Sequence, residues 1–560
     1  MAAIKAYLYS SLTTSIRGME NLSPKIFTSH QRIYVDNEIR NSNIYVAKKI
    51  KELLGTSFGP KGSHKLYVSK SGKMILTKQG FKILNILPLN HPVAKIFADI
   101  AEAQFEECGD GTISAVILSA ELLDISSRLL EKGLSPRILL EGFKEAGLKA
   151  LELYENISTP VQLEDVNSLM DIVKTSIASK VQPEEVTVLA DLIVKVWLMV
   201  NKFEECNFSP QDCIKISKIK GGSLRESKVI NGLVIHTQIA HPDMPKIIKN
   251  AKIALIDQGL SVRKTKLSAK VEVNGFRGLA EIVQCEREIM RSIARKLVEV
   301  GANVVFCRRG IHDAVLHYLS RAGIITTKRV NMSDFEKLSK VTGAKIVNCV
   351  EELRKSDLGF ARYVKEEKIQ GDKIVIVEGC GQPGSTTILL RGVSEKLLEE
   401  VERTIISALK SIKVLVHESK VVAGGGASEI KVSLALKEYA KSIPGKRQVA
   451  VEAFAEALEI IPKLLAKNLD LDPIETLAKL KYLHLHGEHY AGLDALNGEI
   501  TNTFERGILE PLYCKKQMIK SAVEAVLLLL KTDQLIIVTR PEGIKRTKDV
   551  LQRFKKIASE

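Results

Sequence analysis

Two helical blocks with a strand-rich block between them most restrict how this chain of 560 residues can fold. Apolar residues recur every three or four positions in residues 37–54, 113–131 and 136–155, which predicts helices. Helical patterns return at Ser394 and continue to Leu530. Because both ends are helical and the middle is not, we expect a middle domain inserted into a helical domain that both ends of the chain build.

The middle block consists of short runs rich in β-branched residues. Helical patterns, such as residues 284–300 and 333–341, separate several of these runs. Strands that alternate with helices favour an α/β domain with a partly parallel sheet. The predicted strands are residues 252–257, 303–307, 323–327, 345–350 and 373–378.

The composition is that of a folded protein, with 45% hydrophobic and 26% charged residues. The formal net charge of +16 is compatible with nucleic acid, an acidic partner or simple solubility, and it does not choose among them. The 8 cysteines form no CxxC pair, so we expect buried free thiols in a reducing, cytoplasmic compartment rather than disulfides. No apolar run approaches the ~20 residues that a membrane helix needs.

The N-terminus carries no clear pattern before about Asn37. Residues 1–17 are rich in Ser and Thr and lack acidic residues, as in a transit peptide, but their basic residues are just Lys5 and Arg17. We therefore expect a disordered extension, and a translation start at Met19 is the open alternative.

Three glycine-rich loops are candidates for binding phosphate. Residues 55–62 (GTSFGPKG) follow a predicted helix and lack the Gly-Lys-Ser/Thr of a Walker motif. Residues 109–114 (GDGTIS) open a predicted helix, whose N-terminal N–H groups and dipole attract phosphate, and the carboxylate of Asp110 suits magnesium. Residues 424–426 (GGG) also precede a helical stretch. Taken singly, each loop is better explained as a tight turn or a helix cap.

Together and in this order, the loops resemble those of the group II chaperonins, the archaeal thermosome and the eukaryotic cytosolic chaperonin. The resemblance extends over nearly the whole chain. The matching stretches are Gly59-Pro60-Lys61-Gly62 and residues 109–112 (GDGT), 220–223 (KGGS), 241–253 (HPDMPKIIKNAKI), 301–307 (GANVVFC), 378–380 (EGC), 387–392 (TILLRG), 422–427 (VAGGGA), 453–462 (AFAEALEIIP) and 507–511 (GILEP).

The resemblance implies an α+β multidomain subunit with a helical equatorial domain that binds ATP, a small intermediate domain, and an α/β apical domain with a helical protrusion. It also implies double rings of homologous subunits, of one kind or of several, that enclose unfolded protein. The implied boundaries are 1–36 for the N-terminal extension, 37–157 and 413–538 for the equatorial domain, 158–224 and 377–412 for the intermediate domain, 225–376 for the apical domain and 539–560 for a basic C-terminal tail.

The resemblance also implies a site for ATP and Mg²⁺, with Asp110 as the metal ligand. Ile113 stands where the family has a threonine, and Lys180 matches a lysine that senses the γ-phosphate. Glu510 matches an acid that binds ribose, and Asp494 lies in the segment that contacts adenine. The full set of implied nucleotide-binding residues is Ser57, Gly59, Pro60, Lys61, Gly80, Asp110, Gly111, Thr112, Ser114, Lys180, Gly425, Asp494 and Glu510.

Two positions depart from the family at the hydrolytic centre. The family's Thr-Asn-Asp-Gly is here Thr77-Lys78-Gln79-Gly80, and Ser407 stands where a catalytic aspartate is expected. Gln79 could orient the attacking water but cannot take its proton at neutral pH, and Ser407 is a poorer substitute than aspartate, so no catalytic residue is assigned and we expect weakened hydrolysis. The alternatives are that another acid compensates or that the alignment slips near Ser407. Glu402, on the same predicted helix, is a poor substitute.

The predicted protrusion corresponds to residues 274–287, where the resemblance implies a lid and substrate face. Ordinary core packing of the same apolar stripe is the alternative. The stripe consists of Phe276, Leu279, Ile282 and Val283.

The tail, residues 540–560, is strongly basic and is best explained as a solvated helix or flexible tail; a cavity floor that attracts acidic clients or RNA is the alternative. Three functions therefore stay open. The first is an ATP-dependent chaperone subunit with weakened hydrolysis. The second is a non-hydrolysing structural or regulatory subunit of a mixed ring. The third, which is less favoured, is an RNA-binding protein on the same scaffold.

Overall fold

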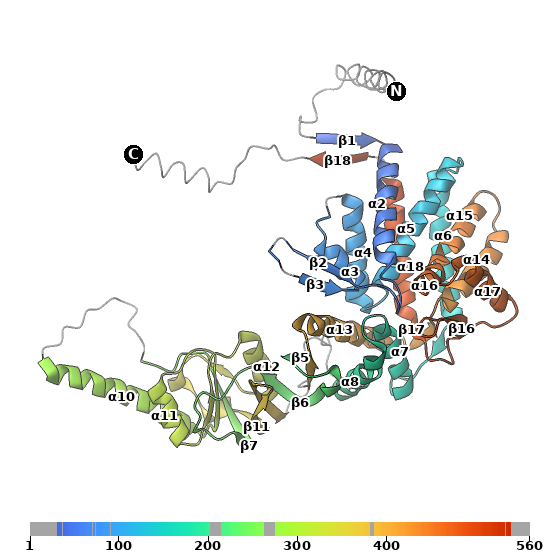
Figure 1. Cartoon of the computed structure of the whole chain (residues 1–560). Helices are drawn as coiled ribbons and strands as arrows, with labels where there is room; N and C mark the ends of the chain where they lie inside the picture. Colours follow the sequence, from blue (N-terminus) through green and yellow to red (C-terminus); the bar gives the residue numbers. More distant parts are fainter. Residues whose placement is uncertain are drawn as a thin grey trace, which may run out of the picture.

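Helices from the two ends of the chain pack together in the computed structural model, which describes residues 31–35, 37–69, 71–72, 74–89, 91–201, 214–262, 275–380, 386–532 and 534–538. Figure 1 shows them as one lobe, with a strand-rich lobe at the far end of the molecule. The helices of this first lobe are α2 (Asn37–Gly55), α3 (Gly80–Ile86), α4 (Pro92–Cys108), α5 (Thr112–Glu131), α6 (Pro136–Asn156), α14 (Ala427–Lys441), α15 (Arg447–Leu458), α16 (Ile460–Asn468), α17 (Pro473–Leu485) and α18 (Leu512–Lys531).

One hydrophobic core joins these two sets of helices. Phe97 and Phe143 from the first set are buried in the same cluster as Phe454 and Met518 from the second. The apolar helix α5 lies against α2, α4 and α18, so little of its surface meets water. The core therefore needs both ends of the chain, which agrees with the predicted insertion.

A second core lies between the two lobes. It is built by α7 (Val166–Ala178), α8 (Pro183–Asn201) and α13 (Glu395–His417), which bury Ile177, Trp197 and Ile405. The chain passes through this region twice, once on its way into the strand-rich lobe and once on its way back (Figure 1).

The strand-rich lobe contains a nine-stranded sheet with the order β5-β13-β6-β12-β11-β7-β8-β9, and β10 also pairs with β7. β7, β8, β9 and β10 run parallel and β11, β12 and β6 antiparallel, which confirms the predicted mixed sheet. The strands are β5 (Ile214–Lys220), β6 (Lys228–Ile235), β7 (Ile247–Ile256), β8 (Val304–Cys307), β9 (Ile325–Thr327), β10 (Ile346–Val347), β11 (Gly359–Ile369), β12 (Asp372–Cys380) and β13 (Thr386–Gly392).

Three helices accompany this sheet: α10 (Gly275–Val300), α11 (Asp313–Arg321) and α12 (Met332–Thr342). The C-terminal half of α10 buries Met290, Ile293 and Leu297 in the core of the lobe. Its N-terminal half extends away from the sheet (Figure 1). The helix therefore starts earlier than the predicted residue 284, and it includes part of the predicted protrusion.

Short strands interrupt the C-terminal block, where the sequence predicts helix alone. β14 (Lys420–Ala423) pairs with β17 (Leu509–Pro511) and β4 (Thr159–Pro160), and β15 (Ala491–Asp494) pairs with β16 (Glu499–Asn502). The prediction is incomplete here because these strands are too short to show an alternating pattern.

Two further strand pairs lie at the surface of the helical lobe. β2 (Lys65–Val68) and β3 (Met74–Thr77) pair as an antiparallel hairpin, and β1 (Gln31–Val35) pairs with β18 (Gln534–Val538) near the two ends of the chain. The fold is thus α+β with several cores, as predicted.

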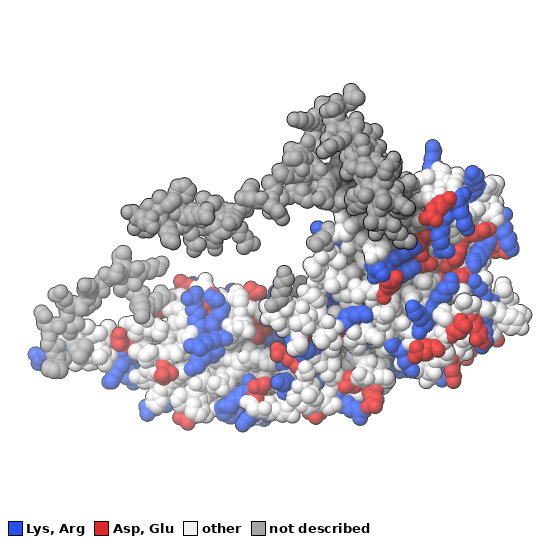
Figure 2. Space-filling view, turned by 45° about the horizontal axis from the view of Figure 1, so that its top comes forward, with Lys and Arg blue, Asp and Glu red and all other residues white. Residues whose placement is uncertain are grey.

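The surface and the cysteines complete the description. Figure 2 shows Lys and Arg interspersed with Asp and Glu over this face of the helical lobe. Of the described cysteines, Cys108, Cys307 and Cys514 are buried free thiols, as predicted, whereas the free thiol of Cys285 is exposed. Among the described helices, none is long and apolar enough to cross a membrane.

Candidate functional site

A cavity of about 410 Å³ lies where the helical lobe meets α7 and α13. The three glycine loops border it, and so do Gln79 and Ser407. Lys61 does not line it and is exposed. The predicted nucleotide-binding residues that do line it are Ser57, Gly59, Pro60, Gly80, Asp110, Gly111, Thr112, Ser114, Lys180, Gly425, Asp494 and Glu510.

The first loop, which follows α2, is held against α16. Asn468 donates hydrogen bonds from Nδ2 to the carbonyl oxygens of Gly55 and Phe58, both at 2.8 Å. Gly59 has a φ of +74°, and a Cβ there would lie 2.6 Å from the Leu465 side chain. The Ser57 hydroxyl is buried at the cavity and has no hydrogen-bond partner among the described residues, so it is available to a ligand.

The second loop ends α4 and begins α5. Gly109 closes α4 with a φ of 71°, and Gly111 is the N-cap of α5 with a φ of 76° and no side-chain cap. The first N–H groups of α5 therefore lack a side-chain acceptor at the cavity wall. Gln104 donates to the Asp110 carbonyl oxygen at 3.2 Å and fixes the loop between the two glycines.

The third loop connects β14 to α14. Gly426 is the N-cap of α14, with a φ of 82° and again no side-chain cap. A Cβ on Gly425 would lie 2.5 Å from the carbonyl oxygen of Leu493, so only glycine permits this approach. Two long helices thus begin at one cavity with uncapped N–H groups, an arrangement that suits a phosphorylated ligand.

Asp110 and Lys180 form an ion pair between the second loop and the turn after α7. Lys180 Nζ lies 3.1 Å from Asp110 Oδ1, and its side chain is 8% exposed against 38% for the carboxylate. Among the described residues, no cluster of three His, Cys, Asp or Glu could hold a metal by itself. A single carboxylate beside a phosphate site nevertheless fits Mg²⁺, which is commonly held by one or two carboxylates, phosphate oxygens and water.

Ser407 projects from α13 to the same ion pair. Its hydroxyl donates to the Gly109 carbonyl oxygen at 2.6 Å and accepts from Lys180 Nζ at 2.9 Å. Gln79 lies 4% exposed at the start of α3, and neither atom of its amide group has a partner among the described residues. Both positions therefore border the cavity.

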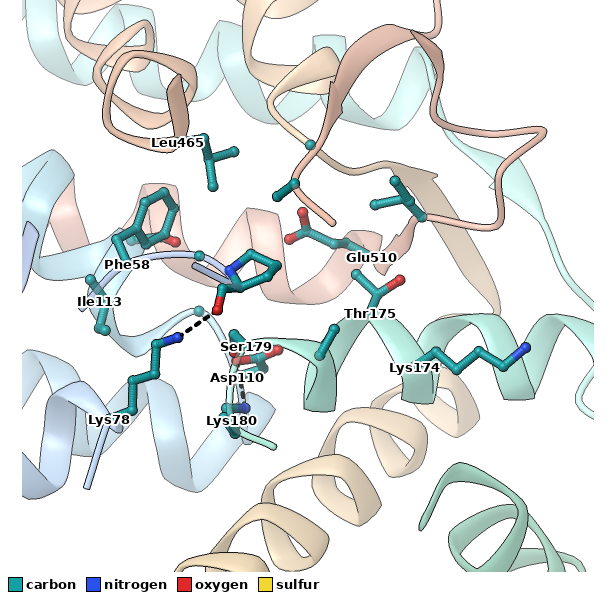
Figure 3. A pocket seen from close by; sticks show the side chains of 18 of the residues that line it. Phe58, Lys78, Asp110, Ile113, Lys174, Thr175, Ser179, Lys180, Leu465 and Glu510 are labelled. Atoms are coloured by element: carbon teal, nitrogen blue, oxygen red, sulfur yellow. Dashed lines mark hydrogen bonds and ion pairs between the residues drawn. The ribbon is translucent and has the colours of Figure 1, made fainter. Parts of the chain in front are cut away.

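Glu510 lies across the cavity from Lys78 in Figure 3. Lys515 pairs with Glu510 at 2.7 Å and with the buried Glu429 at 2.6 Å. Burial raises the pKa of Glu510, and Lys515 opposes this rise. A Cβ on Gly424 would lie 2.9 Å from Glu510 Oε1, so this glycine leaves room for the carboxylate.

Lys78 is a charged cavity residue that sequence reasoning did not assign to the site. It appears in the sequence only as part of the altered Thr77-Lys78-Gln79-Gly80 stretch. Its Nζ donates to the carbonyl oxygen of Pro60 at 3.0 Å, which places the ammonium beside the first glycine loop (Figure 3). Burial, with a contribution from Lys180, lowers the pKa of Lys78 from 10.5 to about 8.

The predicted lid stripe lies on α10. Ile282 and Val283 are 37% and 40% exposed, away from the core of the lobe. The side chains of Phe276 and Leu279 lie outside the described residues. For the two residues that can be assessed, exposure disfavours the core-packing alternative.

Comparison with known proteins agrees with this arrangement. Residues 50–540 match the TCP-1/cpn60 chaperonin family. A thermosome subunit of Pyrococcus horikoshii is 41% identical over 513 residues, which cover 91% of this chain and 93% of that protein. A thermosome subunit beta of Thermococcus kodakarensis is 41% identical (91% and 94% covered), and a thermosome subunit alpha of Archaeoglobus fulgidus is 39% identical (90% and 92% covered). The chain therefore belongs to the TCP-1/cpn60 chaperonin family, as a group II chaperonin.

Proposed function

We propose that this protein is a chaperonin ring subunit that binds Mg–ATP in the cavity, binds unfolded protein and assists its folding, with weakened ATP hydrolysis. The observation that carries the proposal is the cavity itself. Two long helices begin there without side-chain caps, and glycine loops let backbone N–H groups approach a ligand.

Each part of the cavity has a distinct role in this proposal. The N-termini of α5 and α14 would hold phosphate oxygens, and Asp110 would hold Mg²⁺, which supplies charge neutralisation between the phosphates. Lys180 would balance the charge of Asp110 and place a cation near the terminal phosphate. Glu510, across the cavity, would accept a hydrogen bond from the ribose.

The weakened hydrolysis follows from the groups that border the phosphate side. A water that attacks phosphorus needs a group that orients it and accepts its proton. Gln79 can orient a water but cannot accept the proton, and the Ser407 hydroxyl is already bonded to Gly109 and Lys180. Absence of a general base costs about 10²–10⁴ in rate.

Nearby carboxylates do not replace the missing base. Glu402 pairs with Lys218 at 2.7 Å and does not line the cavity. Glu400 is 2% exposed and is held by Arg403 and by the backbone N–H of Lys78. These contacts support the proposal over compensation by an acid on the same helix.

The other acids that line the cavity are also occupied. The Asp494 side chain accepts hydrogen bonds from the Leu496 and Asn497 backbone N–H groups and from Asn497 Nδ2. The Asp171 carboxylate pairs with Lys174 at 3.6 Å.

Ring assembly is part of the proposal, and an exposed hairpin supports it. Leu66, Val68 and Met74, on β2 and β3, are 61%, 57% and 50% exposed. Apolar side chains grouped on a two-stranded hairpin suit a surface that a neighbouring subunit covers. Whether the ring is of one kind or mixed stays open, as does a subunit that binds nucleotide and leaves turnover to its neighbours.

Two further expectations from the sequence are RNA binding and a cytoplasmic location. The basic tail that motivated RNA binding lies outside the described residues, so we do not propose that function. We expect the protein in the cytoplasm, where its free thiols would persist.

The test is steady-state phosphate release from ATP by the assembled protein, beside a double variant Gln79→Asp with Ser407→Asp. The matched control is Gln79→Asn with Ser407→Asn, which has the same shape without the carboxylates. We expect turnover to rise by about 10²-fold or more in the Asp variant alone. Equal turnover in the natural protein and the Asp variant would refute weakened hydrolysis. If none of the three proteins released phosphate although nucleotide was bound, the result would favour the non-hydrolysing subunit of a mixed ring.

A further inference from the structure

Lys78 places a buried ammonium group at the cavity without a carboxylate to balance it. The residue is 4% exposed, and its Nζ donates to a neutral acceptor, the Pro60 carbonyl oxygen, at 3.0 Å. Among the described residues, no Asp or Glu side chain lies within ion-pair distance of Nζ. Lysine is rarely buried unless it is paired, so this arrangement calls for an anion.

The charged groups around Lys78 do not supply that anion. Lys180, from the turn after α7, adds a second positive charge and contributes to the lowered pKa of Lys78. On α13, Glu400 Oε1 accepts the backbone N–H of Lys78, and Arg403 neutralises this carboxylate at 2.7 Å. Burial, with a contribution from Lys78, lowers the pKa of His64, so this ring supplies no negative charge either.

The position of Lys78 selects one part of the ligand. Its ammonium lies beside the first glycine loop and next to Gln79, whereas Glu510 and Lys174 lie on the other side of the cavity (Figure 3). If the ribose lies at Glu510, the triphosphate extends toward Lys78, and the terminal phosphate comes closest to it. This step rests on the proposed function.

We infer that Lys78 and Lys180 form a two-lysine subsite for the terminal phosphate of a nucleoside triphosphate, with Lys78 as the residue that favours triphosphate over diphosphate. Lys180 is shared with Asp110, so Lys78 is the cation of the pair without a carboxylate partner. An ammonium that the free protein leaves unbalanced gains its counter-ion when the terminal phosphate arrives. The subsite thus favours retention of unhydrolysed nucleotide, which fits the absence of a general base.

The experiment measures binding rather than turnover. Dissociation constants for Mg²⁺ with the β,γ-imido analogue of ATP and with ADP are determined by calorimetry on the assembled protein. The variants are Lys78→Met, which keeps the length without the charge, Lys78→Asn and Lys78→Arg. Lys82→Met, on α3 four residues after Lys78 and outside the cavity lining, is the matched control.

We expect Lys78→Met and Lys78→Asn to raise the dissociation constant of the ATP analogue by roughly 10- to 100-fold, because one charge-assisted hydrogen bond is lost. The dissociation constant of ADP should change little. Lys78→Arg should retain most of the preference for the ATP analogue over ADP, and Lys82→Met should retain all of it. An unchanged ratio of the two constants in Lys78→Met overturns the subsite and leaves the proposed function intact. Failure of the natural protein to bind either nucleotide overturns both.

Two further readouts separate binding from folding. Because Lys78 is buried without a carboxylate partner, Lys78→Met without nucleotide should melt at the same temperature as the natural protein or higher. A lower melting temperature in Lys78→Met would mean that Lys78 stabilises the fold itself, and this result would overturn the inference. The affinity for the ATP analogue should also fall as pH rises from 7 to 9 in the natural protein and stay flat in Lys78→Met, since the pKa of Lys78 is about 8.

Discussion

Ser407 shows how one side chain can both remove a reactive group and add a structural one. Its hydroxyl donates to the Gly109 carbonyl oxygen and accepts from Lys180. An ionised aspartate could accept from Lys180 but could not donate to a carbonyl oxygen. Serine therefore joins α13, the second glycine loop and the turn after α7 in a contact that an ionised carboxylate cannot make.

Gly109 provides a prediction that concerns a single residue. A Cβ there would lie 2.3 Å from the Ser407 carbonyl oxygen and 2.5 Å from Lys410 Cβ, and the φ is +71°. Gly109→Ala should therefore lower the free energy of unfolding by about 3 kcal/mol or more. The strain of a left-handed backbone at alanine and the clash with the α13 backbone both contribute to this loss.

The measurement is the thermal midpoint at one scan rate, with Gly133→Ala as the control. Gly133 has a φ of +85° and nothing within 4 Å of the added Cβ, so this variant reports the left-handed strain alone. A Gly109→Ala midpoint as high as that of Gly133→Ala would show that the loop can move away from α13, contrary to the tight packing described here.

The site residues that the sequence revealed are those whose role depends on a local pattern. Gly59, Gly111 and Gly425 lie in glycine runs beside helices, and all three line the cavity. Lys78 carries no such signal, because its environment comes from Pro60, 18 residues away, and Glu400, 322 residues away. Burial without a carboxylate partner is a property of the packed protein, and one sequence does not report it.

Among the elements, α6 is tied to two partners from the far end of the chain through Glu155. This carboxylate pairs with Lys420 of β14 and Lys516 of α18. Hydrogen bonds from Lys420 and Lys516 lower the pKa of Glu155 from 4.5 to about 2. The group therefore stabilises the fold fully above about pH 4.5, and this contribution is lost as the pH falls toward 2.

Glu155→Gln should consequently flatten the acid side of the stability profile. We expect the thermal midpoint of the natural protein to fall more steeply between pH 5 and 3 than that of the variant. Glu152→Gln, on the same helix and paired with Lys149 at the surface, serves as the control and should keep the natural slope. If the thermal midpoints of the natural protein and of Glu155→Gln fell with pH at the same slope, Glu155 would not contribute to the loss of stability in acid.

Element length decided which elements the sequence could reveal. The helices α2, α5 and α6 have 19, 20 and 21 residues, long enough for a helical period to repeat several times. The strands β14 and β17 have 4 and 3 residues, and their partners are distant in the chain. A run of that length is compatible with helix or strand, so pairing across the fold decides it.

For the whole molecule, the β2–β3 hairpin makes assembly testable. Leu66→Lys together with Met74→Glu should abolish the ring, because two charges replace apolar side chains that we expect a neighbour to cover. Sedimentation velocity would then report single subunits, with an unchanged far-ultraviolet circular dichroism spectrum.

The control for assembly is Val393→Lys, at an apolar side chain that is 75% exposed between β13 and α13. This variant should sediment like the natural protein. Intact rings in the hairpin variant would place the contact between subunits elsewhere.

The domain boundaries stay a prediction, although three separate cores support them. One core joins residues from Ala47 to Tyr154 with residues from Val422 to Leu529. A second is confined to residues between Leu233 and Val377, and a third lies between them. A single sequence indicates such an insertion only through the change in its periodic patterns.

The divided core of the helical lobe has a consequence for synthesis on the ribosome. Helices α2 to α6 emerge first, but the partners that cover their apolar faces begin only at Val422. Roughly 270 residues separate the two halves, so at typical elongation rates the first half waits on the order of 15 to 50 s for the second. During that interval Phe143 lacks Phe454, on which its ring packs in the complete fold, so we expect the nascent chain to need a holding chaperone until its own C-terminal helices arrive.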